Sequence, residues 1–275
     1  IALLIAGLTA SVLGVSMEHI TLSKEFILLV LLPPLLFEGA ATTDLEYLRR
    51  NLVPILAMAV VGLVVSIVVL GLAGIYAFGF PLIISLLFAS MILPTDPVSV
   101  LALFEELGAP ERLATLVEGE SLVNDGVGVV IFSALVVYAT GEQDPAALFT
   151  RTGIGDLVLQ IVFFSIGGLF VGLAAGAVVY NVMHNLDEHM TEIVLTIILA
   201  YGAFILAEHY LHVSGVIATV VAGLFIGNRG AEYAMSPQTK ISIFNTWEAG
   251  AFLINTLIIK IINNKTKVQK IMTHN

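Results

Sequence analysis

The chain contains no cysteine among its 275 residues and a single tryptophan. The absence of cysteine excludes disulfide bonds, thiolate metal sites and a cysteine nucleophile. Charged residues make up 12% of the chain, compared with about 25% in soluble domains. The chain has 11 Lys and Arg and 21 Asp and Glu, so its net charge is negative. A protein with so few basic residues lacks the positive surface that DNA or RNA binding requires. We therefore predict no nucleic-acid partner.

Apolar residues dominate instead, at 58% of the chain with a mean hydropathy of +1.02. This composition predicts an integral membrane protein. The first residues form an apolar run without a basic start or a cleavage site, so we expect this helix to be retained. A spanning helix needs about 20 apolar residues, and continuous apolar runs, unlike alternating ones, exclude barrel strands. The fold class is therefore all-α, a polytopic helix bundle with predicted spans at 1–17, 24–43, 51–75, 82–104, 117–139, 155–182, 191–209, 212–228 and 241–260.

The basic residues predict the orientation of these spans, because cytoplasmic loops carry the excess of Lys and Arg. Arg49, Arg50, Arg112, Arg229 and Lys240 fall in loops on one side, which we predict to be cytoplasmic. The segment 258–275 is rich in Asn and Lys and places lysines on the opposite side. We therefore treat 1–257 as the membrane domain and 258–275 as an atypical tail.

A few carboxylates fall inside or at the rim of apolar spans, where an ionisable group is costly and usually functional. They are Glu38, Asp96, Glu120, Asp125 and Glu208. The other acidic residues lie mostly in loops, where a solvated charge is the expected interpretation.

Asp96 lies in the string Thr95-Asp96-Pro97 within the fourth predicted span. Pro97 has no N–H and disfavours α geometry at Asp96, and Pro94 disrupts the preceding turn. These residues predict a helix broken at membrane depth, where transporters expose carbonyls to a cation and half-helix ends to charges. The alternative is a proline kink with Asp96 as a structural cap.

The fifth span begins with a polar ladder. Ser121, Asn124 and Asp125 stand at helical positions i, i+3 and i+4 on one face, with Glu120 beside them. Their hard oxygens suit ions such as Na⁺, Li⁺ or Mg²⁺, whereas zinc prefers nitrogen and sulfur. For Ser121 and Asn124, hydrogen bonding between helices is an equal alternative.

The roles of two further carboxylates, Glu38 and Glu208, are not decided by the sequence. Glu38 follows Pro33 and Pro34 near the end of the second span, where a buried and an interfacial position are both compatible with the sequence. Glu208 is followed by His209 and His212, a spacing that two metal ligands could use. Since no third ligand follows, we expect a polar hairpin rim there.

Four motifs together resemble the monovalent cation:proton antiporter family, in its electroneutral NhaP/NHE-like branch. The motifs stand in the family's order and separation at Leu32–Gly39, Thr95–Val98, Glu118–Gly126 and Val213–Ala218. The resemblance covers residues 1–257. It implies an inverted-repeat antiporter fold that is partial here, with one broken helix at 95–97, and the family's first helix and last three helices missing.

The same resemblance implies a function and residue roles. Asp125 would be the carboxylate shared by Na⁺ and H⁺, with Thr95, Ser121 and Glu38 as further oxygen ligands. Three residues would support this site: Asp96 and Asn124 at the helix crossing, and Glu120 paired with an arginine on a later helix. The implied protein is not an enzyme and needs no cofactor. It exchanges Na⁺, or Li⁺ or K⁺, for H⁺ by alternating access, as a homodimer in the lipid of the cell membrane, and serves pH homeostasis.

Two alternatives come from other classes. The string Gly153-Ile154-Gly155-Asp156 matches the GxGD motif of intramembrane aspartyl proteases, but no Tyr-Asp dipeptide supplies the second aspartate that such catalysis needs. The other alternative is a membrane fragment that inserts without transporting.

Overall fold

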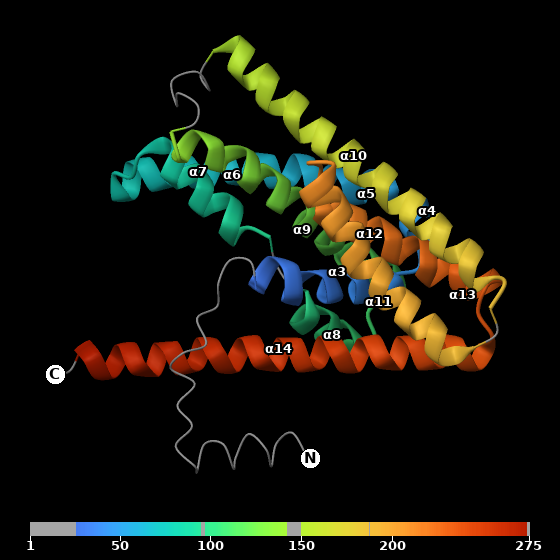
Figure 1. Cartoon of the computed structure of the whole chain (residues 1–275). Coiled ribbons are helices and arrows are strands. Elements are labelled where there is room, and N and C mark those ends of the chain that lie inside the picture. The colour runs from blue at the N-terminus through green and yellow to red at the C-terminus, as the bar shows by residue number, and fades with distance from the viewer. Residues whose placement is uncertain (1–25, 95–96, 142–149, 187, 274–275) are drawn as a thin grey trace.

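The computed structural model describes residues 26–94, 97–141, 150–186 and 188–273 (Figure 1). All regular secondary structure in these ranges is helical, which confirms the all-α prediction. The predicted first span, 1–17, and the residues Thr95 and Asp96 lie outside the described part. Each of the other predicted spans contains helix.

The first half of the described chain forms η2 (Ile27–Leu31), α3 (Leu32–Thr42), α4 (Leu45–Arg50), α5 (Leu52–Leu56), η3 (Ala57–Gly62), α6 (Leu63–Phe78), α7 (Leu82–Ile92), α8 (Val98–Leu107) and α9 (Glu111–Ala139). The second half forms α10 (Arg151–Met183), α11 (His189–Ile205), η5 (Leu206–Tyr210), α12 (Gly215–Phe225), η6 (Ile226–Gly230), α13 (Ala231–Tyr233) and α14 (Pro237–Thr273). The η segments are π-helical turns that continue neighbouring α-helices, a feature that often marks functional positions.

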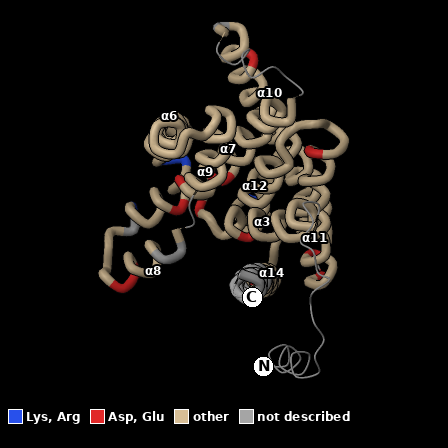
Figure 2. The backbone as a smooth tube through the Cα atoms, turned by 90° about the vertical axis from the view of Figure 1, so that its left-hand side faces the viewer, with Lys and Arg blue, Asp and Glu red and all other residues tan. Residues whose placement is uncertain are grey.

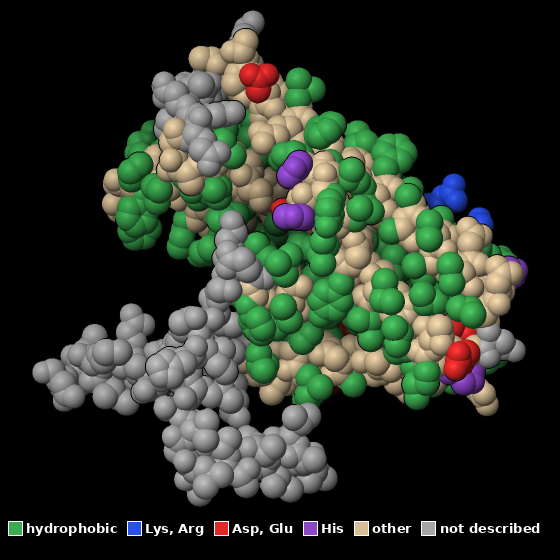
Figure 3. All heavy atoms as spheres, viewed as in Figure 1, with side chains coloured by type: hydrophobic (Ala, Val, Ile, Leu, Met, Phe, Trp, Pro, Cys, Tyr) green, Lys and Arg blue, Asp and Glu red, His purple; other side chains and the backbone are tan. Residues whose placement is uncertain are grey.

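Four helical segments in the described ranges are long and apolar enough to cross a bilayer. They are Leu52–Phe78, Arg112–Ala139, Thr152–Met183 and His189–Tyr210. Charged residues are sparse along the chain trace (Figure 2), and apolar side chains cover much of the face seen in Figure 3. Large apolar residues such as Phe163 and Phe170 on α10 are exposed, as expected for helices whose partner is lipid.

Helix α12 lies at the centre of the bundle, in contact with α3, α9, α10 and α11. The long helices α10 and α14 lie on opposite sides of this central group (Figure 1). Small residues allow the close packing. An ideal Cβ on Gly223 of α12 would lie 2.8 Å from Phe37 O of α3, and one on Gly227 would lie 2.0 Å from Ala41 O.

The helices α6 and α7 form a hairpin because of the residues between them. Gly79 adopts the left-handed conformation (φ 67°) that ends α6, and Pro81 precedes the first turn of α7. Leu63, Ile67 and Ile83 of this hairpin pack with Ile131 and Leu135 of α9 in one apolar cluster. The hairpin and α9 therefore form one packed unit beside the helix break.

Candidate functional site

The predicted helix break is present. Helix α7 ends at Ile92, and α8 begins at Val98, directly after Pro97. Pro94, inside the break, packs against α9, since an ideal Cβ on Gly128 would lie 2.5 Å from Pro94 Cγ. Gly128 is three residues after Asp125 and shares its helix face. The break therefore lies against the face of α9 that carries Asp125.

The polar ladder of α9 is largely withdrawn from the surface. Ser121 and Asn124 are 6% and 4% exposed, and Asp125 is half-buried. One residue further, Gly126 packs against α12, where an ideal Cβ would lie 3.5 Å from Ile217 Cγ1. Asp125 thus lies on α9 between the helix break and the start of α12.

Glu120 and Asn124 form a pair on the neighbouring face of α9. Asn124 Nδ2 donates a hydrogen bond of 3.2 Å to Glu120 Oε1. Both residues line a cavity of about 250 Å³ together with Met58, Gly62, Leu63, Ser66 and Leu93. Within the described residues, Asn124 Oδ1 is buried and has no hydrogen-bond partner. The cavity therefore lies between this polar pair of α9 and the π-helical segment η3, which supplies Met58 and Gly62.

Glu38 is half-buried on the last turns of α3. Glu248 of α14 and Glu118 of α9 lie within electrostatic range of it. Thr43, at the end of α3, donates hydrogen bonds to Gly39 O at 2.7 Å and to Glu118 Oε1 at 3.4 Å. Three helices thus bring carboxylates to the end of α3. Of these carboxylates only Glu38 was a candidate ligand from the sequence, because Glu118 and Glu248 become neighbours of α3 only through tertiary packing.

Glu208 forms the hairpin rim that the sequence predicted. The residue is exposed, and its Oε2 accepts a hydrogen bond of 3.0 Å from Gly215 N at the start of α12. Glu208 and His212 line a second cavity of about 190 Å³. In the described ranges, no group of three or more His, Cys, Asp or Glu side chains could hold a metal ion.

One buried carboxylate, Glu192, was not singled out by the patterns that identified the other candidates. Glu192, in the first turn of α11, is 2% exposed. One turn later, Thr196 accepts a hydrogen bond of 3.0 Å from Trp247 Nε1 of α14. Glu192 lies inside the predicted span 191–209, four residues before Thr196. This position within an apolar span is the signal that could have identified it.

Comparison with known proteins identifies the family. The family model described as "Sodium/hydrogen exchanger, transmembrane" matches residues 1–268. The chain belongs to the sodium/hydrogen exchanger family. It is a multi-pass membrane protein of a transporter family, in the NhaP-like branch.

Individual relatives agree with this assignment. The chain is 39% identical over 255 residues to the Na(+)/H(+) antiporter ApNhaP of Aphanothece halophytica, which covers 93% of the chain and 47% of that relative. It is 36% identical over 274 residues to the Na(+)/H(+) antiporter NhaP of Pseudomonas aeruginosa, covering 95% of the chain and 62% of the relative. The chain thus spans about half the length of the curated relatives it matches.

A solved structure of the sodium proton antiporter MjNhaP1 from Methanocaldococcus jannaschii at pH 8 has the same fold. Its TM-score is 0.67 at 19% identity, and the match covers 84% of this chain and 55% of that one. The exchanger fold and family give no support to the protease interpretation. Asp156, the carboxylate of the GxGD string, is exposed near the start of α10.

Proposed function

We propose that this chain forms the ion-exchanging region of an Na⁺/H⁺ antiporter. The proposed cycle exchanges Na⁺, or Li⁺ or K⁺, for H⁺ by alternating access, with both substrates competing for Asp125. The names of the relatives support this proposal, because they are Na(+)/H(+) antiporters. The observation that carries it is the packing of the helix break against the α9 face of Asp125.

The site chemistry follows from this arrangement. Asp125 would bind the cation as an anionic ligand, and Thr95, Ser121 and Glu38 would add oxygens, as hard monovalent ions require. Asn124 and Asp96 would hold the crossing region, and Glu120 would orient Asn124, to which it is hydrogen-bonded. A proton arriving at Asp125 removes the negative charge that holds Na⁺, so no separate proton relay is needed.

The proposal extends to the surroundings of the chain. We place the protein in the cell membrane, in contact with lipid and as a homodimer, with residues 1–257 as the exchanger domain. Arg49, Arg50, Arg112 and Arg229 would face the cytoplasm. The competing hypothesis is that the chain inserts into the membrane but does not transport ions, and the experiment below distinguishes the two.

Exchange by proteoliposomes tests the proposal. Vesicles loaded with a pH-sensitive dye are challenged with Na⁺, and the wild-type protein should move protons in response. Asp125→Asn should abolish this response while membrane insertion persists, because the change removes the titrating group and the anionic ligand together. Asp156→Asn, the matched control on exposed α10, should exchange like the wild type. Normal exchange by the Asp125 variant would refute the site, and an inactive wild type would favour the non-transporting product.

A further inference from the structure

The side chain of Asn228, in η6, forms hydrogen bonds with the backbone of the turn between α3 and α4. Its Nδ2 donates hydrogen bonds to Thr43 O at 3.0 Å and to Leu224 O at 2.9 Å. Its Oδ1 accepts a hydrogen bond of 2.8 Å from Leu45 N. The carboxamide therefore uses both of its N–H groups and its oxygen to join η6 and α12 to the turn at Thr43–Leu45.

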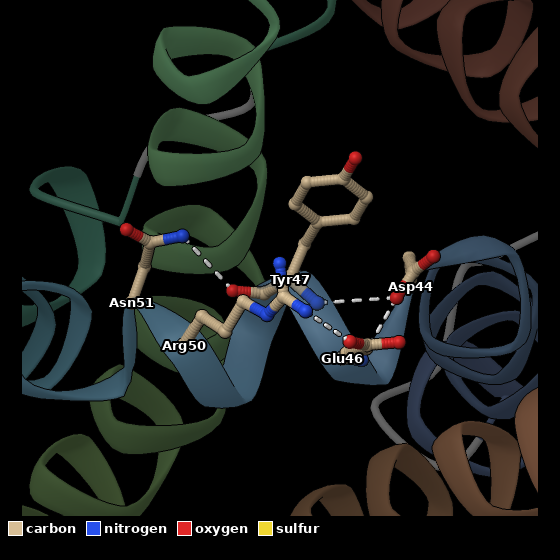
Figure 4. Close-up of polar contacts among 5 residues, drawn as sticks. All are labelled: Asp44, Glu46, Tyr47, Arg50 and Asn51. Carbon is tan, nitrogen blue, oxygen red and sulfur yellow. Dashed lines mark hydrogen bonds and ion pairs between the residues drawn. The ribbon is translucent and has the colours of Figure 1, made fainter.

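These backbone groups are ones that a helix leaves open. Thr43 O follows the last turn of α3, and Leu45 N is the first N–H of α4, so neither has a partner within its helix. Asp44 satisfies the next two N–H groups, of Glu46 and Tyr47, at 2.8 and 3.1 Å (Figure 4). Asp44 thus shapes the turn locally, whereas Asn228 fixes the position of that turn relative to α12.

Just before Asn228, α3 is approached by Gly223 of α12 and Gly227 of η6, whose four-residue spacing places both on one helix face. This contact sets the distance between the helices but offers no directional bond. The hydrogen bonds of Asn228 supply this directional constraint at the end of α3. The helix can then neither slide along α12 nor rotate without breaking them.

The same end of α3 contacts α9 through Thr43, and Glu118 of α9 lies within electrostatic range of Glu38. Thr43 contacts Glu118 of α9, and Glu38 lies about one turn earlier, with its carbonyl accepting from Thr42 Oγ1 at 3.0 Å. We propose that Asn228 is a positioning residue for Glu38: by tying the Thr43–Leu45 turn to α12, it keeps the Glu38 carboxylate in register with α9. This inference rests on the proposed function, in which Glu38 is a cation ligand.

The first test separates cation affinity from turnover. In Asn228→Ala, the KM for Na⁺ should rise about tenfold, the equivalent of one to two ordinary hydrogen bonds, while the maximal rate changes less. Asn228→Asp has the same shape but presents an oxygen to Thr43 O, and it should raise the KM as well. The matched control is Asn181→Ala, since the exposed Asn181 donates within its own helix, to Ala177 O at 2.8 Å. A fall in maximal rate with an unchanged KM would indicate a merely structural role and overturn the proposal.

The second test does not depend on transport. The chain has no cysteine, so Thr43→Cys and Glu118→Cys can be introduced together and joined with a short bifunctional thiol reagent. Adding Asn228→Ala should lower the cross-linking yield several-fold, and adding Asn181→Ala should not. An unchanged yield with Asn228→Ala would overturn the proposal. If the wild type does not exchange Na⁺, the proposed function fails, whereas the cross-linking yield still decides whether Asn228 positions the end of α3.

Discussion

Asn124 on α9 donates its amide N–H to Glu120 one turn earlier, at 3.2 Å, so the pair carries one negative charge at most. The same contact shows why an amide and not a second carboxylate suits this position. Two carboxylates one helical turn apart repel each other, and burial increases the effect.

This pair predicts the electrical behaviour of exchange. If Asp125 alone cycles between one Na⁺ and one H⁺, the loaded site has the same net charge in both states, and membrane voltage does no work on it. A K⁺/valinomycin potential should therefore leave the wild-type rate in proteoliposomes unchanged. Asn124→Asp should make the rate voltage-dependent or impair folding, while Asn181→Asp, the same change on an exposed helix face, should do neither. A wild-type rate that follows the imposed potential would rule out a single cycling carboxylate.

Competition at Asp125 also predicts a pH dependence. At low pH a proton occupies the carboxylate and excludes Na⁺, so the KM for Na⁺ should fall as pH rises, by up to about tenfold per pH unit while the protonated form dominates. The maximal rate at saturating Na⁺ should change less, since Na⁺ outcompetes the proton. Initial rates over a grid of Na⁺ concentrations and pH values measure both. A KM that is independent of pH would show that the two ions use different sites.

The contact between α3 and α12 predicts a difference between two glycines. Gly227→Ala places a methyl group where Ala41 O lies 2.0 Å away, and such overpacking should cost about 1–3 kcal/mol. Gly202→Ala on α11 meets nothing within 4 Å and should stabilise the helix by up to about 1 kcal/mol. Thermal unfolding in detergent should therefore shift in opposite directions for the two variants. Equal shifts would contradict the close packing.

The single tryptophan predicts a coupling between α11 and α14. Trp247 is 5% exposed and packs on Phe37, with ring centroids 4.7 Å apart. Trp247→Phe keeps the aromatic contact but loses the bond to Thr196, which should cost about 1 kcal/mol. Thr196→Val should cost more, because it leaves a buried indole N–H without an acceptor. The double variant should lose less unfolding free energy than the two single variants lose in sum. Strictly additive losses in thermal unfolding would argue against the bond between Trp247 and Thr196.

The orientation is testable with introduced cysteines. The bonds of Asn228 to Thr43 and Leu45 hold α4, which carries Arg50, beside η6, which carries Arg229. We expect Arg50→Cys and Arg229→Cys to react with an impermeant thiol reagent only when the reagent has access to the cytoplasmic side of the membrane. Ala77→Cys, near the α6–α7 turn, should react from outside intact cells. Reversed labelling would overturn the predicted topology.

Much of the fold could be predicted because a bilayer imposes strict length and polarity rules on a helix. The predicted span 155–182 corresponds to α10, and Pro94 and Pro97 marked the break between α7 and α8. The π-helical turns, such as η3 opposite Glu120, could not be predicted. They depend on how a helix adjusts to its neighbours, and local composition carries no signal for that.

The sequence by itself determined the membrane environment, the helix break and the polar face of α9, since each follows from local residue chemistry and helical periodicity. Only the tertiary structure decided which residues from distant segments meet. Asn228 reaches a turn some 185 residues earlier in the chain, and Glu118 reaches Thr43 across 75 residues. Such pairs depend on the packing of glycine faces between helices. That packing selects one arrangement among many that the same apolar segments could adopt.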